Sequence, residues 1–240
     1  MTNPATDHAM DHRTIGEIAA TVPGATAVFR NYKLDFCCGG EVALADAAAK
    51  RGVDLGEVTH ALASLEGIDH DMLPESTSDL IDHIVTRFHE THRRELPELY
   101  RLARKVESVH ATHPSAPAGL ADILADMLND LESHMAKEEA VLFPLFRRGG
   151  HPSIMHPVAQ MRREHDTHGQ HLQQIEQLTH NFTPPAEACR SWQALYVGLA
   201  KLTDDLMQHI HIENNVLFPR FDQMQPLVAE HSSCCGCCGG

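Results

Sequence analysis

The sequence predicts an all-α protein, in which an up-down four-helix bundle follows a small N-terminal helical domain. Apolar residues recur at spacings of three and four along four long segments, while the alternation typical of strands is nearly absent. Short connections that contain proline and glycine separate these segments, which favours antiparallel neighbours in a bundle. The chain has 240 residues, enough for one large core and a small second domain.

The N-terminal part reads as a set of short helices. Thr14 and Glu17 have the spacing of a capping box, which predicts a helix start. Further short helices are expected at residues 24–33, 41–51 and 54–66. These elements make a small domain over residues 1–66, and the polar segment 67–78 reads as a linker.

The bundle is expected over residues 79–222. Its four helices are predicted at residues 79–107, 117–147, 156–180 and 185–221. Pro97 lies inside the first of them and is expected to kink it. Residues 223–240 are predicted to form a flexible tail, which contains Cys234, Cys235, Cys237 and Cys238.

Polar residues interrupt the apolar stripe of the second and fourth bundle helices at equivalent places. The second helix has a predicted stripe of Leu120, Leu124, Met127, Leu131, His134, Glu138, Val141 and Leu145. The fourth has Trp192, Leu195, Leu199, Leu202, Leu206, His209, Glu213 and Val216. Each stripe therefore carries a histidine followed four residues later by a glutamate, and both motifs lead into Val-Leu-Phe-Pro.

The first and third bundle helices carry a second repeated motif, His-Glu-Thr-His and His-Asp-Thr-His. Their predicted stripes are His89, His92, Leu96, Leu99 and Ala103, and Val158, Met161, His165, His168, Leu172 and Ile175. The bundle thus reads as an internal two-fold repeat.

Buried carboxylates and imidazoles must compensate one another, because an unpartnered buried charge costs several kcal/mol. Two bound metal ions would compensate them better than ion pairs between imidazolium and carboxylate, the alternative that leaves a plain helical bundle. The predicted ligands are His89, His134, Glu138, His165, His209 and Glu213. With both glutamates bridging, each ion has four protein ligands and open positions for a small ligand. This donor set suits iron, with manganese or zinc as alternatives.

Two further histidines and two acids lie close to the predicted ligands in the sequence. His92 and His168 are candidates for further ligands or for groups that contact the ligands. Glu139 and Glu164 could also contact the ligands, although a solvated surface is the expectation for them.

Charge and cysteine content limit the partners. The chain has 19 basic and 33 acidic residues, a net charge of −14, which argues against nucleic acid and anionic membranes as partners. No apolar run approaches the roughly 20 residues of a spanning helix, and no secretory signal is recognised. Seven cysteines, clustered in adjacent pairs, do not read as a disulfide framework, so a reducing cytoplasm is expected.

The histidine and glutamate motifs resemble those of hemerythrin-like domains. Oxygen-carrying hemerythrins pair two histidines one turn apart on the third helix and close the site with an aspartate, whereas this chain has Gly169 and Glu213 instead. The symmetric set, with the ending Ile-Glu-Asn-Asn-Val-Leu-Phe-Pro-Arg, is similar to the iron–sulfur cluster repair di-iron proteins. The N-terminal segment 14–40, which ends in Cys-Cys-Gly-Gly, is similar to the small domain of that family.

The resemblance implies a function and a cofactor. It implies a cytoplasmic, homodimeric protein that helps to repair iron–sulfur clusters after nitrosative or oxidative stress, with damaged iron–sulfur proteins as clients. It implies two carboxylate-bridged non-haem iron ions held by the six residues predicted above, and NO or O2 as small ligands. An NO-reducing enzyme activity stays open beside iron supply. The alternative function is a scavenger or sensor that binds NO or O2 without turnover.

Cys37 and Cys38 are adjacent and precede two glycines. They are either a buried thiol with a bystander, or a thiol pair that handles electrons, NO or iron. The tail cysteines either bind a soft metal or have no single role. Cys189 is expected to be structural.

Overall fold

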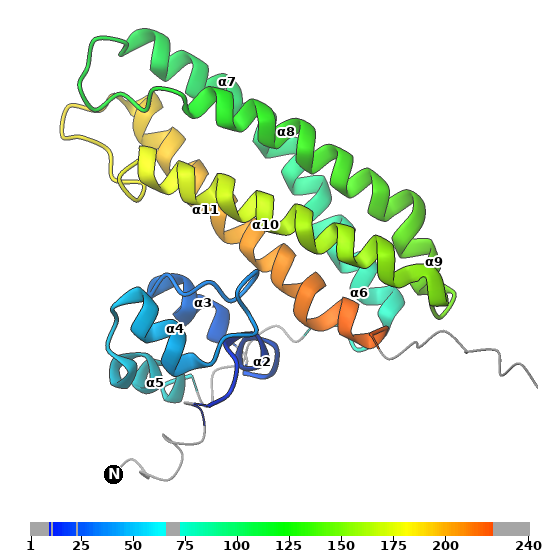
Figure 1. Cartoon of the computed structure of the whole chain (residues 1–240). Coiled ribbons are helices and arrows are strands. Elements are labelled where there is room, and N and C mark those ends of the chain that lie inside the picture. Colours follow the sequence, from blue (N-terminus) through cyan, green and yellow to red (C-terminus); the bar gives the residue numbers. More distant parts are fainter. Residues whose placement is uncertain (1–9, 11, 23, 66–72, 223–240) are drawn as a thin grey trace, which may run out of the picture.

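The chain folds as a four-helix bundle with a small helical domain against one side (Figure 1). The structure is a computed structural model and describes residues 10, 12–22, 24–65 and 73–222. Within these residues the regular structure is helical, as the sequence predicts, and one isolated bridge pairs Thr14 with Ala43. No helix in the described part of the chain is both long and apolar enough to span a lipid bilayer.

The described residues of the small domain include four short helices around an apolar core of their own. They are α2 (Ile15–Thr21), α3 (Ala25–Asn31), α4 (Leu44–Arg51) and α5 (Leu55–Ala63). The predicted capping box is formed, since the Glu17 N–H donates to Thr14 Oγ1 at 3.1 Å and the Thr14 N–H donates to Glu17 Oε2 at 3.2 Å. Ile18, Phe29 and Phe36 are fully buried in the core of this domain.

Each predicted bundle helix is present, and three of them are built from consecutive pieces. The first combines α6 (Thr77–Ile84), η1 (Val85–His89) and α7 (Glu90–Val109), and the second combines α8 (Leu120–Lys137), η2 (Glu138–Leu142) and α9 (Phe143–Arg147). The third is α10 (Met155–Leu178), after the turn η3 (Pro152–Ile154), and the fourth combines α11 (Arg190–Ile212), η4 (Glu213–Leu217) and η5 (Phe218–Arg220). In the bundle α7 packs against α8 and α11, and α10 also packs against both.

Three of these pieces, η1, η2 and η4, are π-helical turns, and each begins or ends at a predicted ligand. The Phe143 N–H donates to the Glu138 carbonyl, and the Phe218 N–H donates to the Glu213 carbonyl, five residues back. A proline follows each phenylalanine, and its ring clashes with the carbonyl four residues back in a regular helix. The repeated Val-Leu-Phe-Pro motif therefore favours a widened turn directly after each glutamate.

The π-helical turns correct two predicted core positions. Val141 was predicted to lie in the stripe of the second helix, but it is 53% exposed, and Leu142 is buried instead at 1%. Val216 is only half-buried, while its neighbour Leu217 is fully buried. A π turn inserts one residue into the helical repeat, so the buried positions after it lie one residue later in the sequence than in a regular α-helix.

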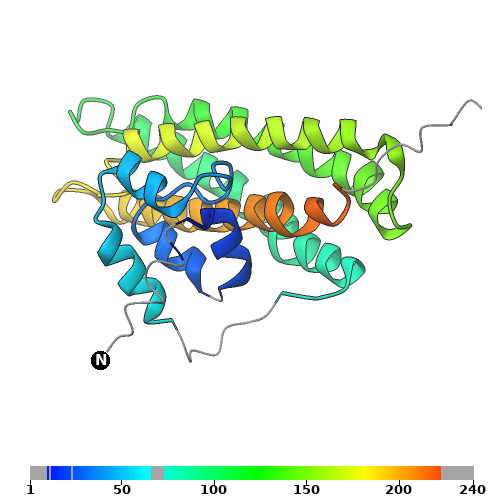
Figure 2. The same cartoon turned by 60° about the horizontal axis from the view of Figure 1, so that its bottom comes forward.

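The small domain contacts the bundle near the end of the fourth helix, where α2 lies against η4 (Figure 2). Asn215 Nδ2 donates to the Phe36 carbonyl at 3.4 Å. At Gly40, an added Cβ would lie 2.8 Å from Asn215 Oδ1, so the contact requires a residue without a side chain. The predicted domain boundaries stay predictions, because residues 66–72, where the small domain was predicted to meet the linker, and the tail 223–240 with its four cysteines lie outside the described residues.

Candidate metal centre

The structure brings all six predicted ligands together in the bundle interior, where each of them is buried. They form two clusters of four side chains. The first cluster is His89, Glu138, His209 and Glu213, and the second is His134, Glu138, His165 and Glu213. Both clusters share the two glutamates, which is the arrangement predicted from the internal repeat.

Each glutamate presents one oxygen to each cluster. Glu138 places Oε2 3.5 Å from His89 Nε2 and Oε1 3.4 Å from His134 Nε2. Glu213 places Oε1 3.2 Å from His209 Nε2 and Oε2 3.0 Å from His165 Nε2. The two imidazole Nε2 atoms of each cluster lie 3.1 Å apart. Adjacent ligand atoms around a metal with bonds of about 2.1 Å are separated by about 3.0–3.5 Å, so the spacings fit a cation.

Three of the four imidazoles are oriented by a polar partner at Nδ1. The Nδ1 of His89 lies 2.7 Å from Glu139 Oε1, and that of His134 lies 2.9 Å from Glu164 Oε2. The third, His165 Nδ1, lies 2.9 Å from Asn214 Oδ1. Because oxygen acceptors require a proton on Nδ1, they leave the Nε2 lone pair free for a cation.

Glu139, Glu164 and Asn214 contact the clustered histidines, a role that the sequence reasoning left as an alternative for the two glutamates and did not consider for Asn214. Glu139 and Glu164 were expected on a solvated face, whereas each contacts a ligand histidine of another helix. Their positions next to Glu138 and His165 are the only signal in the sequence.

The two clusters differ in the residues that contact the Nδ1 atoms of their histidines. The internal repeat places Phe88 where the other half has Glu164, since each residue precedes the first histidine of its motif. Phe88 stacks on His209 with ring centroids 5.4 Å apart, and His209 Nδ1 has no hydrogen-bond partner in the described residues. The cluster of His89 and His209 therefore has one oriented imidazole, and the other cluster has two.

Burial acts in the same direction on the pKa values of the two shared glutamates, but their neighbours act differently. Burial raises the pKa of Glu138 well above its usual value, and the neighbouring Glu213 carboxylate raises it further. Burial also acts to raise the pKa of Glu213, but the imidazoles around it outweigh burial and hold that pKa well below its usual value. None of the four carboxylate oxygens of Glu138 and Glu213 accepts a hydrogen bond from the described residues.

The histidines offer only partial compensation for these carboxylates. Burial lowers the pKa of His89 to about 4, with His209 adding to the effect, and burial also lowers the pKa of His165. For His134, burial is outweighed by Glu138 and Glu164, which raise its pKa to about 10. Pairing of Glu138 and Glu213 with imidazolium groups is therefore favoured at His134, but at His89 and His165 it would need protons on imidazoles whose pKa is lowered.

Comparisons with known proteins identify both parts of the chain. Residues 80–221 match the hemerythrin HHE cation-binding domain, and residues 11–66 match a domain of unknown function, DUF542. A probable iron-sulfur cluster repair protein of Haemophilus influenzae is 46% identical over 211 residues, which cover 86% of this chain and 95% of the relative.

The chain belongs to the iron–sulfur cluster repair protein family. The iron-sulfur cluster repair protein YtfE of Dickeya chrysanthemi is 47% identical over 87% of this chain and 96% of its own length. The YtfE protein of Escherichia coli O1:K1 is 47% identical over 86% of this chain and 94% of its own length. The hemerythrin domain implies binding of non-haem iron, and the two buried clusters could hold metal.

In this repair-family chain, His92 and His168 are also buried, but neither belongs to the two ligand clusters. The ring of His168 lies edge-on to His134 with centroids 5.0 Å apart, and the ring of His92 lies 5.4 Å from that of His209. His92 Nε2 and His168 Nδ1 have no hydrogen-bond partner within the described residues. Both histidines therefore pack against the clustered imidazoles through ring contacts.

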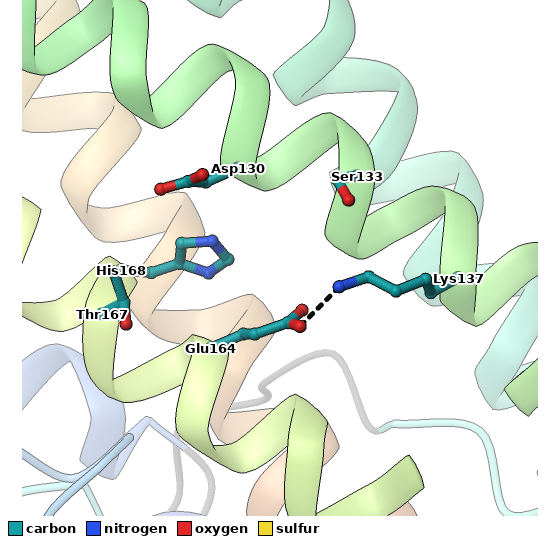
Figure 3. A pocket seen from close by; sticks show the side chains of 6 residues that line it. All are labelled: Asp130, Ser133, Lys137, Glu164, Thr167 and His168. Atoms are coloured by element: carbon teal, nitrogen blue, oxygen red, sulfur yellow. Dashed lines mark hydrogen bonds and ion pairs between the residues drawn. The ribbon is translucent and has the colours of Figure 1, made fainter.

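A pocket of about 250 Å³ lies between α8 and α10, beside the second cluster (Figure 3). Its lining residues are Asp130, Ser133, Lys137, Glu164, Thr167 and His168. Glu164 faces Lys137 across the pocket and also orients His134. The pocket thus reaches the side chains that contact the ligand histidines, and it is wide enough for a diatomic molecule.

Proposed function

We propose that this chain is a di-iron protein that helps to repair iron–sulfur clusters damaged by nitrosative or oxidative stress. It acts by supplying iron, by removing NO, or by both. The observation that carries this proposal is the pair of buried clusters that share Glu138 and Glu213, in a chain 46–47% identical to proteins named for iron–sulfur cluster repair. Damaged iron–sulfur proteins are the proposed clients.

The proposed iron ligands are the six side chains of the two clusters, with two histidines and both glutamates for each ion. The carboxylate oxygens support this, because they are buried and accept no hydrogen bond from the described residues. A cation between them would remove the cost of several kcal/mol for burying an unpartnered carboxylate. The second ion is supported by the repeat, because the clusters are equivalent in residue type and spacing.

The protein residues bind, orient and shield the metal. Iron held by two imidazoles and carboxylate oxygens, with open positions, supplies affinity for NO or O2 and one-electron redox chemistry. Glu139, Glu164 and Asn214 hold three imidazoles with Nε2 toward the cation. Phe88, Phe143 and Phe218 stack on ligand histidines and exclude water from that side of the site.

The test is the metal content of Glu138→Ala and Glu213→Ala. Each variant loses a shared ligand of both ions, so each should lose most of its iron and its cluster-repair activity. Iron per chain and Mössbauer spectra, recorded before and after NO, measure this directly. The exposed Glu132→Gln variant is the control, because Glu132 pairs with Arg93 and contacts no ligand. Two irons per chain with unchanged spectra in both alanine variants would contradict the ligand assignment.

The same experiment separates the alternatives. Turnover of NO under reducing conditions supports an NO-reducing activity, whereas stoichiometric binding supports the scavenger or sensor. A purified, metal-free protein that stays folded would support the plain helical bundle. A homodimer and a cytoplasmic location are further proposals, tested by mass in solution and by cell fractionation.

A further inference from the structure

A third group of metal-ligand side chains lies in the small domain, outside the two bundle clusters. Asp35, Cys37 and Cys38 each offer one ligand atom, and these atoms lie within 4.8 Å of one another. Both cysteines are free. Their sulfur atoms are 3.7 Å apart, far beyond the roughly 2.05 Å of a disulfide bond.

The spacings in this group match the edges of a coordination shell. Cys37 Sγ lies 3.7 Å from Cys38 Sγ and 3.3 Å from Asp35 Oδ1. A tetrahedral cation with metal–sulfur bonds of about 2.3 Å separates two sulfur ligands by about 3.8 Å, and a sulfur from an oxygen by about 3.6 Å. The observed separations lie within a few tenths of an ångström of these values, so a cation would fit with small side-chain movements.

The backbone holds the three side chains in this arrangement. The Cys38 N–H donates to Asp35 Oδ1 at 3.0 Å, which turns the chain back on itself. At Gly39, an added Cβ would lie 2.9 Å from the Asp35 carbonyl, so the turn needs a glycine there. The carbonyl of Cys37 accepts a hydrogen bond from Asn214 Nδ2 at 3.0 Å, which fixes the turn to the bundle.

We propose that Asp35, Cys37 and Cys38 form a third metal site, which binds one divalent transition-metal cation through two thiolates and a carboxylate. Two thiolates select soft or borderline cations such as ferrous iron, cobalt or zinc over magnesium or calcium. Cys37 is buried and Asp35 is exposed, so the cation enters from the Asp35 side and keeps an open position toward solvent.

Binding at this site is a proton exchange without a redox step. The hydrogen bond with Cys38 raises the pKa of the Cys37 thiol well above its usual value, and burial raises it further. The Cys37 thiol therefore keeps its proton until the cation arrives. Binding of the cation through thiolates releases thiol protons to solvent. The cation stays divalent, and water or a client ligand takes the remaining position.

The site is next to the bundle ligands. Cys38 Sγ donates to the carbonyl of His165 at 3.5 Å, and Asn214 joins the Cys37 carbonyl to His165 Nδ1. An open, three-ligand site beside a buried one is suited to passing iron between the bundle and a client. This role rests on the proposed function, whereas binding of the cation does not.

Cobalt binding to the iron-loaded, reduced full-length protein tests the site. The background variant has serine at Cys189, Cys234, Cys235, Cys237 and Cys238, so that only Cys37 and Cys38 remain. We expect one Co²⁺ per chain with a thiolate-to-cobalt charge-transfer band, while the iron content stays constant. The double variant C37S/C38S should lose the band, and Asp35→Asn should weaken cobalt binding about tenfold or more. Asp46→Asn, an exposed acid of the same domain, should leave it unchanged.

The outcomes are decisive for the site and for its role separately. Absence of the band in the background variant, or an equal band in C37S/C38S, would overturn the site. If C37S/C38S does not fold by circular dichroism, the single variant C38S decides, because Cys38 is only half-buried. Normal cobalt binding in the background variant, with full cluster repair by Asp35→Asn, would keep the site and refute its role in iron transfer. Loss of iron from the bundle clusters would bear on the proposed function alone.

Discussion

Glu139 and Glu164, the two carboxylates that orient clustered histidines, provide a test of which proposed metal ion each histidine binds. Glu164 orients His134, a ligand of the second cluster, and Glu139 orients His89, a ligand of the first. Removing such a partner typically lowers metal affinity about 10–100-fold, which corresponds to about 1.4–2.7 kcal/mol. We therefore expect Glu164→Ala and Glu139→Ala each to weaken one ion by this amount and to leave the other nearly unchanged.

Competition with a coloured chelator under anaerobic conditions measures both affinities. The ferrous protein should release iron in two steps of one ion each, and each variant should shift one step by about 10–100-fold in chelator concentration. The double variant should shift both steps. Glu132→Gln is the matched control, because Glu132 is 55% exposed and pairs with Arg93, the same residue that pairs with Glu139. The reasoning is refuted if each single variant shifts both steps equally, or if the control shifts them as far.

Two further predictions concern stability, measured by denaturant unfolding of the iron-loaded protein. Leu142→Ala should lower the free energy of unfolding by about 2–5 kcal/mol, because it leaves a cavity at a buried position. Val141→Ala should change the free energy of unfolding by less than about 0.5 kcal/mol, because Val141 is exposed. A larger loss for Val141→Ala than for Leu142→Ala would mean that the π-helical register is wrong. At Asp205, burial acts to raise the pKa, but hydrogen bonds from Arg87 and Lys201 outweigh it and lower the pKa. Because the pKa of this carboxyl group is lower in the folded than in the unfolded protein, the ionised group stabilises the fold at pH values above its unfolded-state pKa. This stabilisation is lost as the pH falls through the folded-state pKa. Asp205→Asn should therefore cost about 1–3 kcal/mol at neutral pH, and the difference should shrink below pH of about 4; a difference that does not depend on pH would contradict this.

The clustering of the six proposed ligands could be predicted from the sequence because the relevant contacts repeat along single helices. His134 and Glu138 are four residues apart, as are His209 and Glu213, and such residues share one face of a helix. A charged residue inside an apolar stripe is costly, so its presence there is informative. The repeat then linked these helices to the two that carry His89 and His165.

The register after each glutamate could not be predicted in the same way. The spacing of three and four residues predicted Val141 as the next buried position after Glu138, but the π turn buries Leu142 instead. For Glu139 and Glu164, contact with the ligands was an open alternative, but a solvated surface was expected for a different reason. Glu139 and Glu164 are partly exposed and next to ligands, so their sequence pattern is that of surface acids. Their contacts cross between helices, which a single-helix pattern does not report.

The departures from the internal two-fold repeat have a physical explanation on the side of the small domain. Glu139 and Asn214 occupy equivalent positions, one residue after each shared glutamate, and each accepts from the Nδ1 of a ligand histidine. Asn214 also donates from Nδ2 to the Cys37 carbonyl at 3.0 Å. A carboxylate has no hydrogen to donate, so a glutamate or aspartate there could orient His165 but could not hold the Cys37 turn. The amide at position 214 therefore lets a single residue both orient His165 and hold the small domain.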